Sequence, residues 1–345
     1  MVITMQDARE LRARRARATA VVSLYLNVPV DIAEHHGLLI RARDLLKAAE
    51  VDQAMAIASD SDLTEVITTV AARSQDWLGQ GVAIFACAEL GLFEVMKLPG
   101  PAADLAMIGA RPYLRPLLAT VQRNPAYQVA VIDSKHAWML GIGDGEISTL
   151  AERTGRQVPS KAFGGWYGLE TYRIQQRVMQ LSRQHFRDTI AMLVNGAAAR
   201  PLPLVLGGQE AEISQFCAML PDAISKRVAG TFGVDSQVAT PGRVRELAAP
   251  VIADWVAAGE AQLVNDLMNE QPGKTVITGV GECATAVRAR AVAQLVLADG
   301  QHPAPDVLDE MAGQALDGGG EVTAVRDAPF AAAARLRFQV TAPSP

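Results

Sequence analysis

The chain has few cysteines, no net positive charge and no long uncharged hydrophobic run, and each absence excludes a class of protein. Its 345 residues include only three cysteines, Cys87, Cys217 and Cys283, which are scattered in apolar surroundings. This usage is typical of reduced, buried thiols in a cytosolic protein, because disulfide frameworks and metal sites need clustered cysteines. The formal net charge of −5 excludes a protein that coats RNA over its whole surface.

Long apolar segments are also missing. No run of about 18–20 residues is free of charge, so no membrane span is expected. The N-terminal residues run into arginine-rich sequence without an apolar core, which argues against a signal peptide. We therefore expect a cytoplasmic protein with no membrane partner.

Metal-ligand spacing and catalytic constellations are not evident either. The histidines lack ligand partners at metal-like spacing. No Ser-His-Asp or Cys-His arrangement can be argued from the residue order. We expect no metal and no cofactor, and no catalytic residue is assigned.

Strand-like and helix-like segments alternate along the chain, which indicates a mixed α/β fold. At this length, several domains are expected, each with its own core. A proline-punctuated stretch at residues 111–118 suggests the end of the first domain. We expect three mixed α/β domains in a row, at residues 1–122, 123–198 and 199–345. The central domain carries a glycine loop that leads into a long basic helix.

The most informative segment is this loop, Gly164-Gly165-Trp166, and the helix that follows it. Helical spacing of about 100° per residue groups four arginines and three glutamines in one sector. These residues are Arg173, Gln176, Arg177, Gln180, Arg183, Gln184 and Arg187. The apolar residues on the remaining arc are expected to face a core: Ile174, Val178, Met179, Leu181, Phe186 and Ile190. Guanidinium groups in a row suit phosphate, because each offers a planar fork of donors and stays charged at any working pH.

Acidic residues are nearly absent from this helix face. An ordinary solvated face mixes Glu with Lys, whereas Glu170 and Asp188 stand only at its edges. Residues 151–187 hold seven Lys and Arg residues against two Glu residues, in a chain that is acidic overall. The pattern favours a surface directed at nucleic acid. Two alternatives stay open: a solvated face that happens to lack Glu, and a structural turn in which Trp166 folds back on the domain.

Other segments invite a functional interpretation that their context does not support. Gly207-Gly208-Gln209 follows a buried strand and precedes a helix, so we interpret its glycines as structural. His185 falls at the helical angle of the apolar residues, and we expect a hydrogen-bonded histidine at the edge of the core. The arginine-rich residues 9–17 are compatible with an RNA contact or with a fraying terminal helix.

The order of these elements resembles the bacterial archaeo-eukaryotic release factor family, which is related to the archaeal and eukaryotic class-1 release factors and to Pelota. The likeness covers most of the chain. Besides the glycine loop and its helix, it is carried by residues 81–86, 204–208, 278–279 and 295–297. The resemblance implies a release-factor-like fold. In that family the N-terminal domain serves the decoding end, the central domain carries the catalytic loop, and the C-terminal domain is a ribosomal-protein-like α/β domain.

The glycine loop departs from the pattern of the hydrolytic members. They carry Gly-Gly-Gln at the loop tip, where the Gln helps to position water at the peptidyl-tRNA ester, and this chain has Trp166 at the matching place. An indole cannot supply the paired donor and acceptor of an amide. It could instead stack on a base, a contact worth on the order of 1–3 kcal/mol. The resemblance therefore implies a place on the ribosome more than release chemistry, and it extends to the bacterial hibernation factor Balon.

The sequence supports three hypotheses about function. The first is a ribosome-binding protein that acts in hibernation or rescue and contacts rRNA or tRNA in the A site. It would not release peptide by the Gly-Gly-Gln mechanism, and an elongation factor is a further candidate partner. The second is a peptidyl-tRNA hydrolase acting on stalled ribosomes, in which Gln175 or Gln176 replaces the missing loop Gln. The third is a stress adaptor that keeps the fold but binds protein through its acidic surface.

Overall fold

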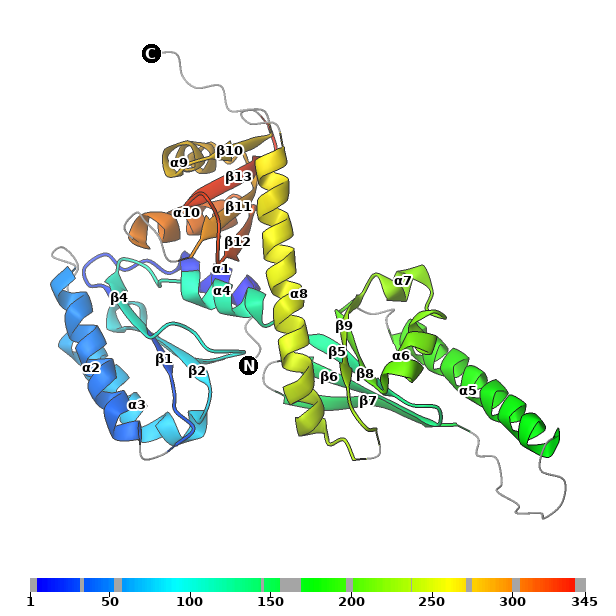
Figure 1. The fold of residues 1–345 in the computed structure, drawn as a ribbon. Coiled ribbons are helices and arrows are strands. Elements are labelled where there is room, and N and C mark those ends of the chain that lie inside the picture. The colour runs from blue at the N-terminus through cyan, green and yellow to red at the C-terminus, as the bar shows by residue number, and fades with distance from the viewer. Residues whose placement is uncertain are drawn as a thin grey trace. The chain divides into compact units, whose positions relative to one another are not determined.

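The chain forms two compact units, each a mixed α/β body, which confirms the predicted fold class (Figure 1). Unit 1 combines Met1–Asn124 with Ala258–Pro345, and unit 2 is Pro125–Ala257. The computed structural model describes residues 5–31, 34–52, 58–143, 146–155, 169–196, 201–236, 238–270, 275–299 and 305–338.

The N-terminal part of unit 1 is built on an antiparallel sheet of four strands in the order β3-β2-β1-β4. Helices α2 and α3 cover one of its faces. The elements are α1 (Met5–Ala13), β1 (Val21–Asn27), α2 (His35–Asp52), α3 (Asp60–Arg73), η2 (Ser74–Trp77), β2 (Gly81–Cys87), η3 (Ala88–Leu90), β3 (Leu92–Leu98), β4 (Leu105–Gly109) and α4 (Arg115–Arg123).

Both faces of this sheet are buried, which explains why its central strands are apolar along their length. Successive residues of a strand point to opposite faces. Val22 and Leu24 of β1 therefore join the core formed with α2 and α3, while Val21 and Tyr25 join the core formed with α4. All residues of β2 are buried for the same reason.

The C-terminal part of unit 1 is a second four-stranded sheet, in the order β10-β13-β11-β12. Only the β11–β12 pair is parallel. One face packs on the end of the long helix α8 through Leu263, Val264 and Leu267. The opposite face packs on α9 and α10. The elements are α8 (Pro241–Asn269), β10 (Val276–Thr278), α9 (Val280–Arg288), β11 (Val292–Ala298), α10 (Pro305–Asp317), β12 (Glu321–Val325) and β13 (Ala332–Leu336).

The two parts of unit 1 share one hydrophobic core. Phe85 and Leu117 from the N-terminal part belong to the same buried cluster as Leu295 and Leu308 from the C-terminal part. We expected these parts to be separate domains, at residues 1–122 and within 199–345. The structure differs in that they pack as a single unit.

Unit 2 is a five-stranded sheet in the order β7-β6-β5-β8-β9, with helices on both faces. Strands β5, β6 and β7 are antiparallel neighbours, whereas β8 and β9 add in parallel. Helices α5, α6 and α7 cover one face and the start of α8 covers the other. The elements are β5 (Tyr127–Ile132), β6 (His136–Gly143), β7 (Glu146–Thr154), α5 (Leu169–Gly196), β8 (Leu204–Gly208), α6 (Glu210–Cys217), α7 (Asp222–Ser225) and β9 (Val228–Gly233).

The expected boundary between residues 198 and 199 lies inside unit 2. Strand β8 pairs in parallel with β5, with Val129 opposite Val205 and Ala130 opposite Leu206. The chain thus returns to the same sheet after α5. The α8 helix then begins on this sheet, where Val244 and Ala248 are fully buried.

Helix α8 is, within the described ranges, long and apolar enough to cross a bilayer by length and composition alone. A single helix of this kind is weak evidence for a membrane span, because core helices pass the same criterion. Ile252 belongs to the core of unit 2 and Leu267 to a core of unit 1. Each end of the helix thus packs on protein through a few apolar side chains, while most of the apolar stretch is not buried.

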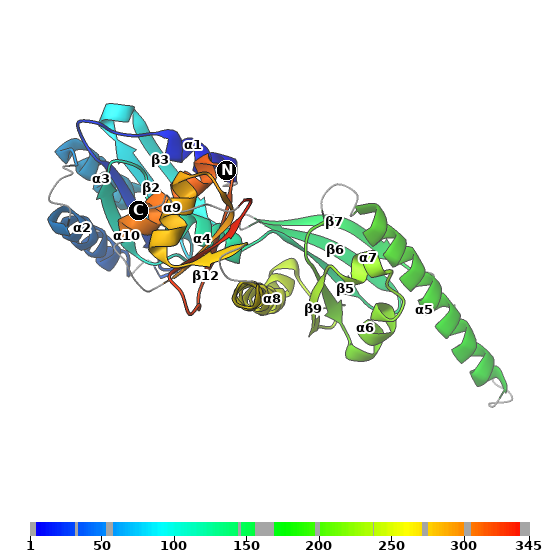
Figure 2. The same cartoon turned by 90° about the horizontal axis from the view of Figure 1, so that it is seen from above.

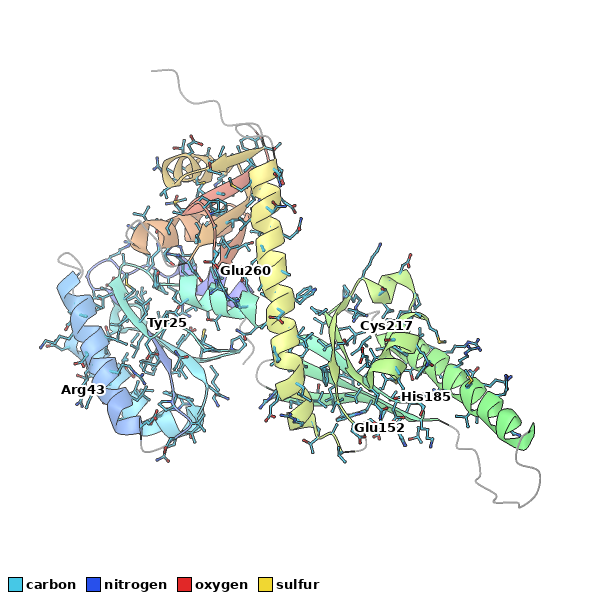
Figure 3. All side chains as sticks on the ribbon, viewed as in Figure 1. Tyr25, Arg43, Glu152, His185, Cys217 and Glu260 are labelled. Carbon is cyan, nitrogen blue, oxygen red and sulfur yellow. The ribbon has the colours of Figure 1, made fainter. Side chains whose placement is uncertain are left out.

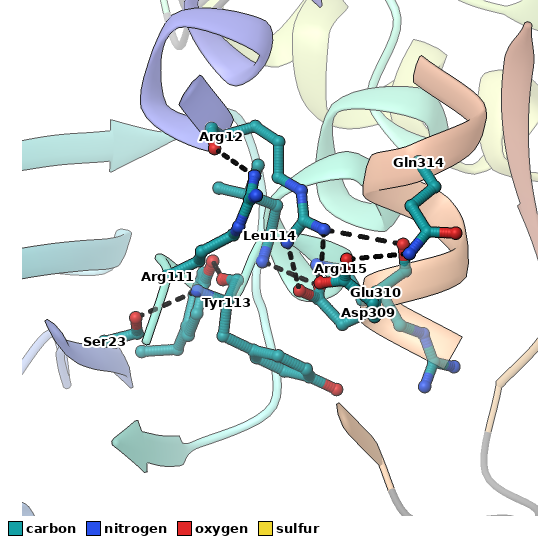
Figure 4. A network of polar contacts seen from close by, with 10 residues as sticks. Arg12, Ser23, Arg111, Tyr113, Leu114, Arg115, Asp309, Glu310 and Gln314 are labelled. Atoms are coloured by element: carbon teal, nitrogen blue, oxygen red, sulfur yellow. Dashed lines mark hydrogen bonds and ion pairs between the residues drawn. The ribbon is translucent and has the colours of Figure 1, made fainter. Parts of the chain in front are cut away.

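A buried arginine ties the N-terminal helix α1 to α10 (Figure 4). The Arg12 side chain, 1% exposed, pairs with Glu310 at 2.5 Å and with Asp309 at 3.7 Å. Asp309 also accepts the backbone N–H groups of Leu114 and Arg115, at the start of α4. Burial raises the pKa of Asp309 to about 6, although these N–H groups and Arg12 favour its charged form.

The segment after α1 is fixed by a carboxylate. Glu89 accepts the backbone N–H groups of Arg17, Ala18 and Thr19 at 2.8–3.0 Å, and these bonds lower its pKa to about 2. Arg14 pairs with Glu94 at 3.4 Å. The arginine-rich residues 9–17 are therefore held by contacts within the protein and do not form a fraying helix. The expected RNA contact is wrong for Arg12, because its side chain is buried.

Candidate nucleic-acid interface

The described part of the predicted basic sector lies on α5, and it is exposed. Helix α5 begins at Leu169, so the loop tip Gly164, Gly165 and Trp166 falls outside the described residues, as does the side chain of Arg173. The exposed members of the sector are Gln176, Arg177, Gln180, Arg183, Gln184 and Arg187. We call Arg177, Arg183 and Arg187 the α5 arginines.

The described N-terminal half of α5 is exposed on every side. Residues 176–180 cover more than one turn of helix and none of them is buried. Figures 1 and 2 show this end of α5 running away from the sheet of its own unit. Val178 is 42% exposed and Met179 is 56% exposed. The prediction that these two residues face a core is wrong, because the helix has left the body at that point.

The C-terminal half of α5 anchors the helix on the sheet. Phe186, Ile190 and Leu193 are buried there, which confirms the predicted core positions of Phe186 and Ile190. The Phe186 ring meets the Phe216 ring of α6 edge to face, at 5.5 Å between centroids. A rigid, well-packed base thus carries the exposed half of the helix.

The acidic edge of the helix is neutralised within unit 2. Asp188 pairs with Arg153 of β7 at 2.5 Å and accepts the Nε2–H of Gln184 at 2.9 Å. Gln184 therefore has an intramolecular partner, whereas we expected its side chain to face only a nucleic acid. Among the residues that the structure describes, no ion pair involves any of the α5 arginines. Their guanidinium groups remain available to an anionic partner.

His185 is buried beneath the exposed sector (Figure 3). A Cβ at Gly155 would stand 3.0 Å from its Nδ1, so the ring fills the space beside that glycine. Burial lowers the pKa of His185, and the nearby carboxylates Asp133 and Asp188 do not offset it. A backbone hydrogen bond with His136 also favours the charged form, but it does not outweigh the effect of burial. The predicted core-edge position is confirmed.

His185 gives unit 2 a pH dependence with a definite sign. Its pKa lies below 6.5 in the folded chain and near 6.5 in the unfolded chain. The folded state is therefore favoured above about pH 6.5 and loses stability as the pH falls below it. His185→Leu should reduce this loss, measured by urea unfolding at about pH 7.5 and about pH 5. Equal losses in both proteins would contradict the assignment.

The Gly207-Gly208-Gln209 segment has a structural role, as predicted. A Cβ at Gly207 would stand 2.5 Å from the Phe232 ring, and one at Gly208 would stand 2.3 Å from the carbonyl oxygen of Ile132. Both glycines lie inside β8. Close packing in the sheet therefore requires them, and Gln209 only precedes α6.

The thiols and candidate metal ligands have no place in this interface. Cys87 and Cys283 are buried, Cys217 is half-buried, and all three are free. Burial raises the pKa of Cys283 to about 12, which leaves its thiol protonated and unreactive. Across the described ranges, no group of three or more His, Cys, Asp or Glu residues could hold a metal ion.

These features define a mixed α/β protein that presents an exposed cationic helix from a firmly packed base. Residues 112–260 match the model of the bacterial archaeo-eukaryotic release factor family 10. The match includes all of unit 2 and therefore the whole of α5. The predicted resemblance to this family is confirmed. No curated protein matches the chain.

Several solved structures show a distant likeness. Archaeal translation termination factor aRF1 is 15% identical, with 96% of each chain covered and a TM-score of 0.28. Archaeoglobus fulgidus Pelota is 16% identical over 76% of this chain and 81% of that chain, with a TM-score of 0.40. An archaeal Pelota from a ribosome-bound model with ABCE1 is 14% identical over 99% of this chain and 96% of that chain, with a TM-score of 0.45. Since these scores lie below 0.5, the functional argument is based on the chain's own residues and the family match.

Proposed function

We propose that this protein binds the ribosome in a tRNA-like position and acts in hibernation or rescue. The α5 helix is its main RNA contact. Its arginines hold phosphate, and Trp166, at the tip of the preceding loop, stacks on a base or fills the site. The protein does not release peptide by the Gly-Gly-Gln mechanism, because the tip has no Gln.

The single observation that carries this proposal is the exposed basic sector of α5, whose arginines make no ion pair within the described residues. Three exposed guanidinium groups on one helix create a local positive field in an acidic chain. A partner must offer closely spaced negative charges, as an RNA backbone does. The family match adds a translational context for this surface.

The shape of the helix supports a narrow binding site. A helix that lies along a flat partner needs only one contact face, whereas residues 176–180 are exposed all round. Val178 supplies an apolar contact on the side away from the arginines, and Met179 supplies another beside Arg183, one turn along the helix. Such a two-sided helix suits insertion between two walls, at least one of which carries phosphate.

Co-sedimentation with 70S particles tests the proposal. We expect the full-length protein to be found in the ribosomal fraction at low salt and to leave it as the salt concentration rises, because phosphate contacts release counterions. Absence from that fraction at both low and moderate salt would overturn the proposal. Binding that is unaffected by salt would favour the protein adaptor instead.

The hydrolase alternative makes a separate prediction. We expect the wild-type protein to leave peptidyl-tRNA intact on stalled ribosomes. The measurement is the fraction of labelled peptide released from a stalled complex. Release by the wild type that is lost on Gln175→Ala or Gln176→Ala would establish the hydrolase and contradict our proposal.

A further inference from the structure

An arginine occupies a backbone position that favours glycine at the end of α9. Arg290 has φ 54°, and it is the one non-glycine residue with positive φ in the described ranges. Its N–H donates to the carbonyl of Val287 at 2.9 Å, and the N–H of Ala291 donates to that of Ala286 at 3.0 Å. This pair of bonds is the Schellman motif, in which the left-handed residue is usually Gly and sometimes Asn.

The same unit contains the motif in its ordinary form. Helix α10 ends with Gly319 at φ 75°, and the N–H groups of Gly319 and Gly320 donate to the carbonyls of Leu316 and Ala315. Left-handed backbone is unfavourable for a residue with a Cβ. Residues held in such conformations persist where the surrounding structure fixes them, and they cluster at functional sites. Arg290 therefore calls for a role of its guanidinium group.

Two further exposed arginines are near Arg290, Arg337 in space and Arg288 two residues earlier in the chain. Arg337 donates to the carbonyl oxygens of Gly318, at 3.0 Å, and of Gly319, and a Cβ on Gly318 would stand 3.8 Å from Cγ of Arg290. Arg288 is the last residue of α9. All three are exposed, and no ion pair in the described part of the chain involves them. Phe338, which follows Arg337, is 56% exposed.

We propose that Arg288, Arg290, Arg337 and Phe338 form a second RNA-binding surface, on unit 1, which we call the α9 patch. The forks of Arg288 and Arg290 bind backbone phosphates, and the Phe338 ring stacks on a base. Arg337 adds its positive charge beside them while it holds the carbonyls of Gly318 and Gly319. An exposed aromatic ring next to arginines favours single-stranded RNA over an acidic protein, because every base offers a face for stacking. The inference rests on the proposed function only in its choice of RNA as the partner.

The αL position makes a sharp test possible. Arg290→Gly removes the charge and also relieves the backbone. We expect its melting temperature to rise by about 2–4 °C. We expect its affinity for a labelled oligoadenylate to fall, with a salt slope smaller by about 0.7 for the lost phosphate contact. Arg290→Lys should keep most of the affinity. A stabilised protein that binds RNA less well separates function from folding.

A matched control and a second substitution complete the experiment. Arg43→Gln removes an exposed arginine from α2 and should leave oligoadenylate binding unchanged. Phe338→Ala should weaken binding about 10-fold, since one stacking contact is worth on the order of 1–3 kcal/mol. The proposal is overturned if Arg290→Gly and Phe338→Ala bind the oligonucleotide as the wild type does, or if Arg43→Gln loses as much affinity as Arg290→Gly.

The two RNA surfaces can be tested independently of each other. If replacing the α5 arginines abolishes ribosome binding and leaves oligoadenylate binding intact, the result supports the RNA contact of α5 and does not bear on the α9 patch. Loss of oligoadenylate binding in Arg290→Gly supports the α9 patch even when the α5 variant binds ribosomes normally. If Arg290→Gly weakens binding to an acidic protein and not to the oligonucleotide, the partner is a protein and the RNA assignment is wrong.

Discussion

Replacement of Arg177, Arg183 and Arg187 by glutamine is expected to weaken binding to 70S ribosomes by on the order of 100-fold at about 0.1 M salt. Each arginine that neutralises a phosphate contributes about 0.7–0.9 to the slope of log affinity against log salt concentration, so the slope should fall by about 2. The fold should survive, because all three side chains are exposed and the helix is anchored by Phe186 and Ile190. The measurement is a salt titration of ribosome binding.

A matched variant distinguishes this site from general attraction. Arg43, Arg73 and Arg243 are exposed arginines on α2, α3 and α8, and replacing them by glutamine removes the same amount of charge. The ion pairs of Arg73 and Arg243 are exposed and contribute little to stability. Arg73 also lies 5.5 Å from the centre of the Trp77 ring, a cation–π contact worth about 0.5–1 kcal/mol. We expect a small change in affinity and an unaltered salt slope. Equal losses in the two variants would mean that net charge, and not the α5 arginines, controls binding.

Gly313→Ala is expected to lower the free energy of unfolding of unit 1 by about 3 kcal/mol or more. This is the cost of removing one partner from a buried ion pair. A Cβ at Gly313 would stand 1.8 Å from Nε of Arg12 and 2.1 Å from its Cζ. The guanidinium group would have to move, which would leave Asp309 without its buried partner. Urea unfolding at neutral pH measures the effect.

Two comparisons make this prediction specific. Gly259 lies in α8 with open space around its Cβ position, and Gly259→Ala should stabilise the protein by about 0.5–1 kcal/mol. Arg12→Ala should itself destabilise, and it should also abolish the penalty of Gly313→Ala, since the collision is then gone. A penalty that persists without Arg12 would contradict the packing described for α10.

Local signals in the sequence predicted individual elements well. The apolar runs at residues 81–87 and 92–98, with a turn between them, are local signals of a hairpin, and they form β2 and β3. The arginine sector of α5 was also evident, since helical spacing alone groups those residues. The short strands β4, β9 and β12 were not predicted.

Long-range pairing was beyond what the sequence could predict. The pairing of β8 with β5 joins strands that are far apart in the chain, and nothing in residues 204–208 identifies β5 as their neighbour. The burial of Arg12 depends on carboxylates almost 300 residues away. Val178 and Met179 followed a core-facing pattern, and that pattern cannot distinguish the protein's own core from a partner's surface.

A map of the protein bound to 70S ribosomes, obtained by electron cryomicroscopy, tests the central claim most directly. The proposal predicts density for α5 against ribosomal or transfer RNA, with the α5 arginines facing phosphates and the loop that carries Trp166 at the leading end. Density that places α5 in solvent, with ribosome contacts made only by other surfaces, would contradict the account.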